Sequence, residues 1–472
     1  MRVPVPSSSS QSPQRREFLR FGLSAFGALS LPDVLRLQAS AGQPASGQKT
    51  AIILVWMRGG CSHLDTFDPK PDAPSEYRGP FKPIETKTPG LRMTELLPKL
   101  ANISDRYTLL RSVAHTGGGH PAGSLQVLAG DTDPQDKVQP VYPDFMSVAH
   151  RLRYDPQKAI PNYIGVNPIT RYDSFTIAGP TYLGGKYAPF SVLGDPNAPN
   201  FRVPNIGLAT DEDRQRLHGR TDLFKNLDSM RRELDAAGSS GAFNQFQGQA
   251  LNLLTSPEAA RAFDLNLESP KLRDRYGRNA WGQQLLMARR LVEAGVEIIT
   301  TELSGPLCGR VQNWDDHAVN HHVFDALKFR MPTVDQAVTA LIEDVYERGL
   351  DKRVLVVLAG EFGRTPKISH VASSGGGVAS GATGTVQPGR DHWPKANTML
   401  FAGGGIRTGR VIGATDRFGE NVTDRRVSPQ DFLATLYQHL GIDYENTALP
   451  DQTGRPIHIV QNGKAIPELV AS

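Results

Sequence analysis

Histidines and carboxylates gather at four places in this sequence, and each group follows an apolar run or lies in a segment that returns to one. Histidine together with carboxylate suits a divalent ion such as zinc, manganese or magnesium. One or two such ions can bind a phosphate or sulfate ester, polarise it and activate an attacking oxygen. The groups are His63 with Asp65, His115 with His120, Asp315 with His317, and Glu361 with Asp391 and His392.

The segment WDDHAVNHH (314–322) is the strongest single signal, because three histidines and two aspartates fall within nine residues. His317 and His321 would share one face of a helix at a spacing of four residues, although an exposed solvated turn is the alternative. Glu361 and Arg364 also have a second interpretation, as an ion pair at the end of a strand.

Apolar runs must position these groups. The runs are 51–57, 107–113, 296–303, 353–359 and 398–406. Continuous runs rich in Ile and Val are typical of buried strands in a mostly parallel sheet that is covered on both faces. Because the carboxyl ends of parallel strands share one edge, loops that are far apart in the sequence converge there.

Helical segments alternate with these runs. Amphipathic patterns predict helices at 281–295, from Pro332 to Gly349 and at 428–443, with Ser428 as N-cap, and a further helix begins near Pro121. We therefore expect a doubly wound α/β fold with helices on both faces of the sheet. The segment 211–264 resembles a charged helical pair without chemistry. The glycine-rich segment 371–389 predicts a flexible loop, either a lid on the site or a surface excursion.

The N-terminus has the features of an export signal. Arg15 and Arg16 precede a moderately apolar stretch that ends at Ala39-Ser40-Ala41, which fits a twin-arginine (Tat) signal at 1–41. A linker at 42–50 and a single domain at 51–465 follow. We expect a periplasmic or secreted protein that uses the Tat export machinery and has no membrane span in its mature chain. An uncleaved membrane anchor is the alternative.

Charge and cysteine content exclude some classes of protein. Without residues 1–41, 47 basic residues stand against 46 acidic ones, which gives no support for nucleic-acid binding. The two cysteines, Cys61 and Cys308, form no CxxC zinc or redox motif. We expect them to stay unpaired, although an oxidising compartment would allow a disulfide.

Several motifs together resemble one bacterial family. They are GGCSHLDTFDPKP (59–71), HTGGGHPAGSLQVLAG (115–130), NWDDH (313–317), GEFGRTPKI (360–368), GRDHWP (389–394) and the closing segment 428–443. This pattern resembles the "domain of unknown function 1501" family over nearly the whole mature chain. That family is similar to the alkaline phosphatase and sulfatase superfamily, which implies a doubly wound α/β sandwich with a bimetal site at the strand ends.

The resemblance also implies roles for single residues. The metal ligands carried over are Asp65, Asp315, His317, Glu361 and His392. The chain departs from the superfamily at two positions. Phe362 takes the place of a ligand histidine, so the site could hold one metal ion instead of two. His120 takes the place of the residue that sulfatases convert to formylglycine. Formylglycine chemistry is therefore not expected.

The leading hypothesis is an exported hydrolase that uses one or two divalent ions (zinc, manganese, magnesium or calcium) on a phosphate or sulfate ester of a small molecule or glycan. His63, His120 and Arg364 would hold the anionic substrate. No nucleophile stands out; the candidate hydroxyls are those of Ser62, Ser112, Thr116 and Ser124. The rival hypothesis is a non-catalytic cell-envelope protein of the same fold that binds a glycan or a protein.

Overall fold

An eight-stranded sheet runs through the middle of the protein in the order β16-β4-β15-β10-β1-β9-β5-β8. This computed structural model describes residues 49–203, 206, 253, 256–305, 307–308 and 311–470. The proposed signal peptide, nearly all of the linker and most of the segment 211–264 lie outside these residues. In sheet order, the strands are Arg410–Ile412, Tyr107–Val113, Asn397–Gly403, Val354–Ala359, Ala51–Trp56, Ile298–Glu302, Tyr163–Val166 and Phe190–Val192.

All neighbouring strands are parallel except at β15, which runs antiparallel to both β10 and β4. The five strands expected from the apolar runs are all present, and the mostly parallel sheet is confirmed. The segment around Tyr163, which none of the apolar runs includes, forms β5 inside the sheet, and β8 lies beyond it as one of the two edge strands. Since β15 is antiparallel, its amino end lies at the edge where the other strands have their carboxyl ends.

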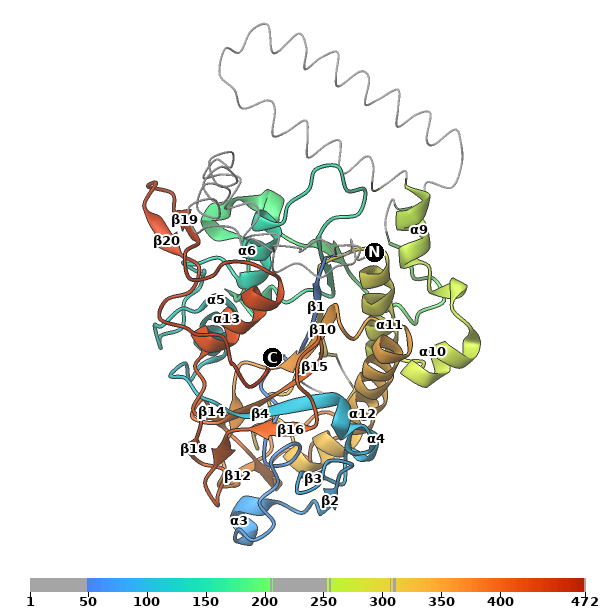
Figure 1. Cartoon of the computed structure of the whole chain (residues 1–472). Coiled ribbons are helices and arrows are strands. Elements are labelled where there is room, and N and C mark those ends of the chain that lie inside the picture. The colour runs from blue at the N-terminus through green and yellow to red at the C-terminus, as the bar shows by residue number, and fades with distance from the viewer. Residues whose placement is uncertain are drawn as a thin grey trace, which may run out of the picture. The chain divides into compact units, whose positions relative to one another are not determined.

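Helices cover both faces of the sheet, as Figure 1 shows. On one face lie α4 (Pro98–Asn102), α11 (Ala280–Glu293) and α12 (Val323–Glu347), and on the other lie α5 (His120–Ala129), α6 (Phe145–Leu152) and α13 (Pro429–His439). Alternate residues of β1 enter the two cores: Ile53 and Val55 pack with the first group of helices, Ile52 and Leu54 with the second. The doubly wound arrangement is therefore confirmed.

Local sequence explains the helix ends. Ser428 and Asp431 form a capping box at the start of α13, as the sequence predicted for Ser428. The helix α12 was expected to start at Pro332 but begins at Val323, and Pro332 lies inside it. The reason is that the imidazole of His322 caps α12 by accepting a hydrogen bond from the backbone N of Asp325.

The remaining elements are short. Two-stranded ladders pair β2 (Pro83–Glu85) with β3 (Arg92–Thr94), β6 (Arg171–Tyr172) with β7 (Phe175–Thr176), β11 (Gly363–Arg364) with β14 (His392–Trp393), β12 (Ser369–Ala372) with β13 (Val386–Gly389), β17 (Ala414–Thr415) with β18 (Val422–Asp424), and β19 (Ala448–Pro450) with β20 (Pro456–His458). Short helices are α3 (Ser75–Arg78), α9 (Pro257–Phe263) and α10 (Pro270–Tyr276). Single 3-10 turns lie at Ser104–Arg106, Thr181–Leu183, Gly185–Tyr187 and Leu265–Leu267. Within the described residues, no helix has the length and apolarity to cross a membrane.

Candidate metal centre

Four side chains from three separate segments meet at the edge where the parallel strands end. His120 is the first residue of α5, just after the glycines that follow β4. Asp315 and His317 come from the long connection between β9 and α12. His392 is the first residue of β14 and pairs with Arg364 of β11 in a two-stranded ladder. The prediction that distant loops converge at this edge is therefore confirmed for these residues.

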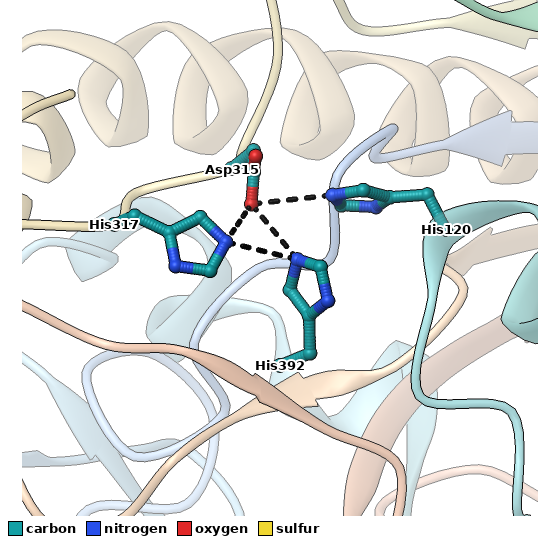
Figure 2. Close-up of side chains that lie close together, drawn as sticks. All are labelled: His120, Asp315, His317 and His392. Atoms are coloured by element: carbon teal, nitrogen blue, oxygen red, sulfur yellow. Dashed lines mark hydrogen bonds and ion pairs between the residues drawn. The ribbon is translucent and has the colours of Figure 1, made fainter. Parts of the chain in front are cut away.

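The potential ligand atoms of the four residues all lie within 4.8 Å of one another (Figure 2). Oδ1 of Asp315 lies 2.8 Å from Nε2 of His317, 3.1 Å from Nε2 of His392 and 3.2 Å from Nε2 of His120. The two Nε2 atoms of His317 and His392 are 3.0 Å apart. Four atoms at such spacings can surround one small cation, because zinc bonds to nitrogen and oxygen measure about 2.0–2.2 Å.

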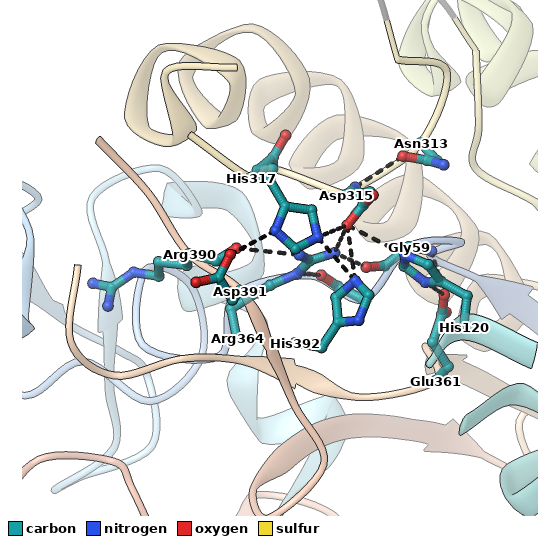
Figure 3. A network of polar contacts seen from close by, with 12 residues as sticks. Gly59, His120, Asn313, Asp315, His317, Glu361, Arg364, Arg390, Asp391 and His392 are labelled. Carbon is teal, nitrogen blue, oxygen red and sulfur yellow. Dashed lines mark hydrogen bonds and ion pairs between the residues drawn. The ribbon is translucent and has the colours of Figure 1, made fainter. Parts of the chain in front are cut away.

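Each of the three histidines is held at its other ring nitrogen. Nδ1 of His120 lies 2.8 Å from Oε1 of Glu361, and Nδ1 of His317 lies 2.6 Å from Oδ1 of Asp391 (Figure 3). Nδ1 of His392 lies 2.8 Å from the carbonyl O of Gly118. Carbonyl and carboxylate oxygens accept hydrogen bonds, so each Nδ1 carries the proton and donates it. The Nε2 lone pairs then point toward Asp315, which is the arrangement that metal-binding histidines use.

Arg364 holds the carboxylate at the centre of the cluster. Its Nη2 lies 2.8 Å from Oδ1 of Asp315, and its Nε donates to the carbonyl O of Gly60 at 2.8 Å. Burial opposes ionisation of Asp315, but the Arg364 guanidinium holds the pKa of this carboxyl well below its usual range. Asp315 is therefore negatively charged at any physiological pH.

Aromatic rings fix the imidazoles from the side. The ring of Tyr172 stacks on His120 with centroids 3.9 Å apart and an angle of 12° between the planes. Phe362 is fully buried, and its ring centroid lies 4.5 Å from that of His392 and 5.2 Å from that of His120. Phe362 thus packs against two of the four potential ligands without offering a ligand atom of its own.

The glycine turn after β1 lets these loops approach closely. Gly59 has a φ of +106°, and a Cβ there would lie 2.7 Å from the backbone N of Asp315. The backbone N of Gly59 donates to Oε1 of Glu361 at 2.7 Å. Any larger residue at this position would push the Asp315 loop away from the cluster.

The two aspartates of NWDDH point in different directions. Asp315 faces the cluster, whereas Asp316 is buried and forms an ion pair with Arg330 and a 3.1 Å contact with Nδ1 of His321. The segment 318–320 is a turn, so His317 and His321 do not share the face of a helix. That interpretation is wrong because α12 begins only at Val323.

Two of the five predicted metal ligands lie outside the cluster. Asp65 is buried, and its Oδ2 lies 2.7 Å from Nε of Arg390, so its charge is already compensated. Glu361 lies behind His120 and contacts the cluster only through Nδ1 of that residue. The convergence expected for all five holds for Asp315, His317 and His392, and His120 takes the fourth place.

The residues predicted to hold substrate are largely enclosed. The guanidinium of Arg364 is buried and bound to Asp315 and to the carbonyls of Gly59, Gly60 and Arg390. His63 is also buried, with Nε2 2.8 Å from the carbonyl O of Gly419. Their predicted contact with substrate stays a prediction, and the structure shows no exposed edge for either group.

The candidate nucleophiles do not reach the cluster by a hydrogen bond. Oγ of Ser62 donates to Asp65 at 2.6 Å, and Oγ1 of Thr116 accepts from Nε2 of Gln126 at 2.9 Å. The hydroxyls of Ser112 and Ser124 are buried without a hydrogen-bond partner among the described residues. The backbone N of Ala122, near the start of α5, donates to Oδ1 of Asp136, so a carboxylate of the chain already binds at this helix terminus.

The glycine-rich segment 371–389 is more ordered than expected. Its ends form the β12–β13 ladder, and the backbone N of His322 donates to the carbonyl O of Ala379 at 2.8 Å. At Gly389, a Cβ would lie 1.9 Å from the backbone N of Ala318, so the hairpin packs directly on the loop that bears His317. It is part of the wall around the site, because the glycines allow contact between backbones.

Sequence reasoning assigned no role to Tyr172 or Asn313, and it named Asp391 only as a potential ligand. Asp391 holds His317, Tyr172 stacks on His120, and Asn313 accepts from the backbone N of Asp315 at 2.9 Å while its Nδ2 donates to the Tyr172 hydroxyl at 2.8 Å. Asp391 directly precedes His392, so its position in the GRDHWP motif was an available signal. Nothing in the sequence around Tyr172 indicates its contact with a residue 52 positions earlier.

Comparison with solved structures returns distant similarities. One is the PsFucS1 sulfatase from Pseudoalteromonas sp., with 13% identity, a TM-score of 0.34, and coverage of 92% of this chain and 73% of that chain. Another is the phosphonate monoester hydrolase of Agrobacterium radiobacter, with 10% identity, a TM-score of 0.36, and coverage of 89% and 77%. A third is the lipoteichoic acid synthase LtaP from Listeria monocytogenes, with 10% identity, a TM-score of 0.37, and coverage of 88% and 75%.

Sequence comparison gives a clearer result. No curated protein matches the chain. A family model described as "Protein of unknown function (DUF1501)" matches residues 49–470, which is nearly everything that follows the proposed signal peptide. The family predicted from the motifs is thereby confirmed, and the chain belongs to the DUF1501 family.

Proposed function

We propose that this chain is an exported hydrolase with one divalent metal ion, acting on a phosphate or sulfate ester. The observation that carries the proposal is the convergence of three imidazole Nε2 atoms and one carboxylate oxygen, with every imidazole held at Nδ1 by an acceptor. Hydrogen bonds at Nδ1 fix the tautomer in which Nε2 can bind a metal.

The donor atoms fit a metal ion. Nε2 of His120 is buried and has no hydrogen-bond partner among the described residues, although it lies 3.2 Å from Asp315. A buried polar atom without a partner is costly, and a bound cation would remove that cost. A set of three imidazoles and one carboxylate favours zinc or manganese over magnesium or calcium, which prefer oxygen ligands.

The residues of the chain then have distinct roles. His120, Asp315, His317 and His392 hold the ion, Glu361 and Asp391 orient two of the imidazoles, and Arg364 orients Asp315. A bound divalent ion supplies Lewis-acid polarisation of the ester. The side chains of His317 and His392 remain 24% and 23% exposed, so an ester can approach the ion from this side.

Water is the proposed nucleophile. None of the candidate hydroxyls donates to or accepts from the four clustered side chains, and a histidine rather than a cysteine or serine begins α5. The start of α5 therefore offers no formylglycine precursor, and none of the four candidate hydroxyls has a hydrogen bond to the cluster.

Metal analysis tests the site first. We expect the full chain, treated with chelator and reloaded with zinc, to retain the ion on dialysis, and the double variant His317→Ala, His392→Ala to lose it. His370→Ala is the matched control, because His370 is exposed and lies outside the cluster. Equal zinc content in the double variant and the control would refute the site.

Turnover tests the reaction. We expect the zinc- or manganese-loaded chain to hydrolyse an aryl phosphate or an aryl sulfate, and the double variant to lose that activity. One observation favours the rival function, a non-catalytic cell-envelope protein: the cluster offers four protein ligand atoms, the number that structural zinc sites use. Tight metal binding without turnover of any ester would establish the rival.

Export is a separate part of the proposal. It rests on the twin arginine Arg15-Arg16 and on the Ala39-Ser40-Ala41 ending of the apolar stretch. We expect the protein in the periplasm or the medium, and the double variant Arg15→Lys, Arg16→Lys in the cytoplasm. Fractionation measures both, and an unchanged distribution would contradict Tat export.

A further inference from the structure

A groove on the surface lies apart from the metal cluster and shares no residue with it. It has a volume of about 490 Å³, which lies within the usual range for small-ligand sites. Three segments line it: residues 140–142, the turn at Thr181 and Tyr182, and the β19–β20 hairpin with its tip. Figure 1 shows this hairpin well separated from β14, which carries His392.

Two tyrosines dominate the groove. Tyr142 and Tyr182 line it together, and both also line a smaller hollow that continues toward α13. Neither phenol hydroxyl has a hydrogen-bond partner among the described residues. Burial, with Tyr142 and Asp451 nearby, raises the pKa of Tyr182, so this hydroxyl keeps its proton and can donate. Tyrosine offers an apolar ring and a polar tip in one side chain.

Thr181 is unusual in two ways. Its φ is +43°, a left-handed backbone that a β-branched residue adopts only at a cost. Its Oγ1 is buried without a hydrogen-bond partner among the described residues. Thr181 is therefore a strained point in the wall of the groove.

Charge in the groove is balanced. Its lining contains one acid and one base, Asp451 and Arg455, and Nε of Arg455 lies 3.2 Å from Oδ2 of Asp451. Asp451 also accepts from the backbone N and the hydroxyl of Thr453, at 2.8 Å and 2.7 Å. An anionic ligand would find no unpaired cation here, and a cationic ligand no unpaired carboxylate.

We infer that this groove binds a neutral glycan. A pyranose ring has an apolar C–H face that can stack on Tyr182 or Tyr142. Its hydroxyls can pair with the protonated hydroxyl of Tyr182 and with the exposed amide of Gln452. A neutral glycan binds through ring stacking and hydrogen bonds and needs no charged partner. The lining of this groove offers both kinds of contact and has no net charge. The inference is independent of the proposed hydrolase function, since the two sites share no residue.

Calorimetric titration of the full chain tests it, with a panel of neutral gluco-, manno-, xylo- and N-acetylglucosamine oligosaccharides. A sulfated oligosaccharide and a proline-rich peptide serve as competing ligand classes. We expect at least one neutral oligosaccharide to bind, and Tyr182→Ala and Gln452→Ala each to weaken binding at least tenfold. Gln452 is exposed, so its loss does not threaten folding. Phe329→Ala removes a 50% exposed aromatic ring elsewhere and should leave binding unchanged.

Several results would overturn the inference. They are the absence of binding to every neutral oligosaccharide, binding of the sulfated compound or the peptide alone, and equal affinity of both groove variants and the wild type. Metal content measured on the same samples keeps the two sites distinct, because both groove variants should retain zinc whether or not they bind a glycan.

Discussion

Nδ1 of His317 lies 2.6 Å from Oδ1 of Asp391, the residue that directly precedes His392 in the chain. The GRDHWP segment therefore contributes twice to the cluster, with one side chain in it and another that orients the imidazole of a neighbouring loop. Such outer contacts raise the basicity of the ligand nitrogen and fix its direction.

Removing the Asp391 carboxylate should weaken metal binding without removing a ligand. For Asp391→Ala, we expect the zinc affinity to fall about 10–100-fold, the usual effect of losing an orienting group. Competition with a chromogenic chelator measures the affinity. Asp424→Ala is the control, because Asp424 is an exposed carboxylate on β18. An unchanged zinc affinity in Asp391→Ala would contradict the orienting role.

The site should take one metal ion per chain. Phe362 fills the space beside His392 and His120, and the Arg364 guanidinium already occupies one side of Asp315. A zinc titration of the chelator-treated chain, followed by melting temperature, should therefore saturate at one equivalent. Zinc at about 100 times its dissociation constant should add about 2.7 kcal/mol to the free energy of unfolding. Saturation at two equivalents would contradict this assignment.

Asp65 should matter for stability and not for metal content. Both partners of the Asp65–Arg390 ion pair are buried, so Arg390→Ala leaves an uncompensated charge and should lower the free energy of unfolding by about 3–5 kcal/mol. Urea denaturation measures this loss. Arg261→Ala breaks an ion pair between largely exposed groups and should cost less than about 1 kcal/mol.

A variant of Asp65 itself distinguishes a role in stability from a role as a metal ligand. In Asp65→Asn, the zinc content should equal that of the wild type, since Asp65 contacts none of the four clustered residues. Loss of zinc from a folded Asp65→Asn variant would restore Asp65 as a ligand.

Stability should fall in mild acid through His439. Burial, reinforced by Arg153, lowers the pKa of His439 from 6.5 to about 4, although hydrogen bonds such as that to the Ala51 carbonyl oppose the shift. Below pH 6.5 the unfolded chain binds a proton at His439 that the folded chain does not bind. The contribution of His439 to stability is therefore present above pH 6.5 and is lost as the pH falls toward 4. Between pH 7 and pH 5 the loss is about 2 kcal/mol.

Urea denaturation at the two pH values measures the loss. Other buried histidines contribute as well, so the informative quantity is the difference between the wild type and His439→Gln, whose amide can still donate to Ala51. The variant should lose less stability on acidification. An equal loss in both proteins would show that His439 titrates normally in the folded state.

The sheet was predictable because burial on both faces leaves a strong pattern. Runs such as those at 51–56 and 354–359 have every residue buried, and only apolar side chains fit there. The direction of β15 was not predictable, since an apolar run reads the same in a parallel or an antiparallel strand. The position of β5 was missed because its four residues lie among prolines and glycines that are typical of loops.

The site was only partly predictable, because side-chain direction after a strand depends on contacts far away in the sequence. Asp315, His317 and His392 were named from their motifs and do converge. Asp65 was named on the same grounds, but its partner Arg390 is 325 residues away, and no pattern in the sequence reveals that pair. His120 was assigned to substrate binding, yet its place at the start of α5 puts it among the potential ligands.

The antiparallel direction of β15 has a consequence for how the chain can vary. Because β15 starts at the edge where β10 ends, the stretch between them, from β11 to β14, begins and ends at the site. Its two ends, β11 and β14, pair in one short ladder. Insertions or deletions at the tip of the β12–β13 hairpin can therefore change the wall of the site while the spacing of Arg364 and His392 stays the same. Relatives of this protein can therefore differ in the wall of the site while the four potential ligands keep their positions.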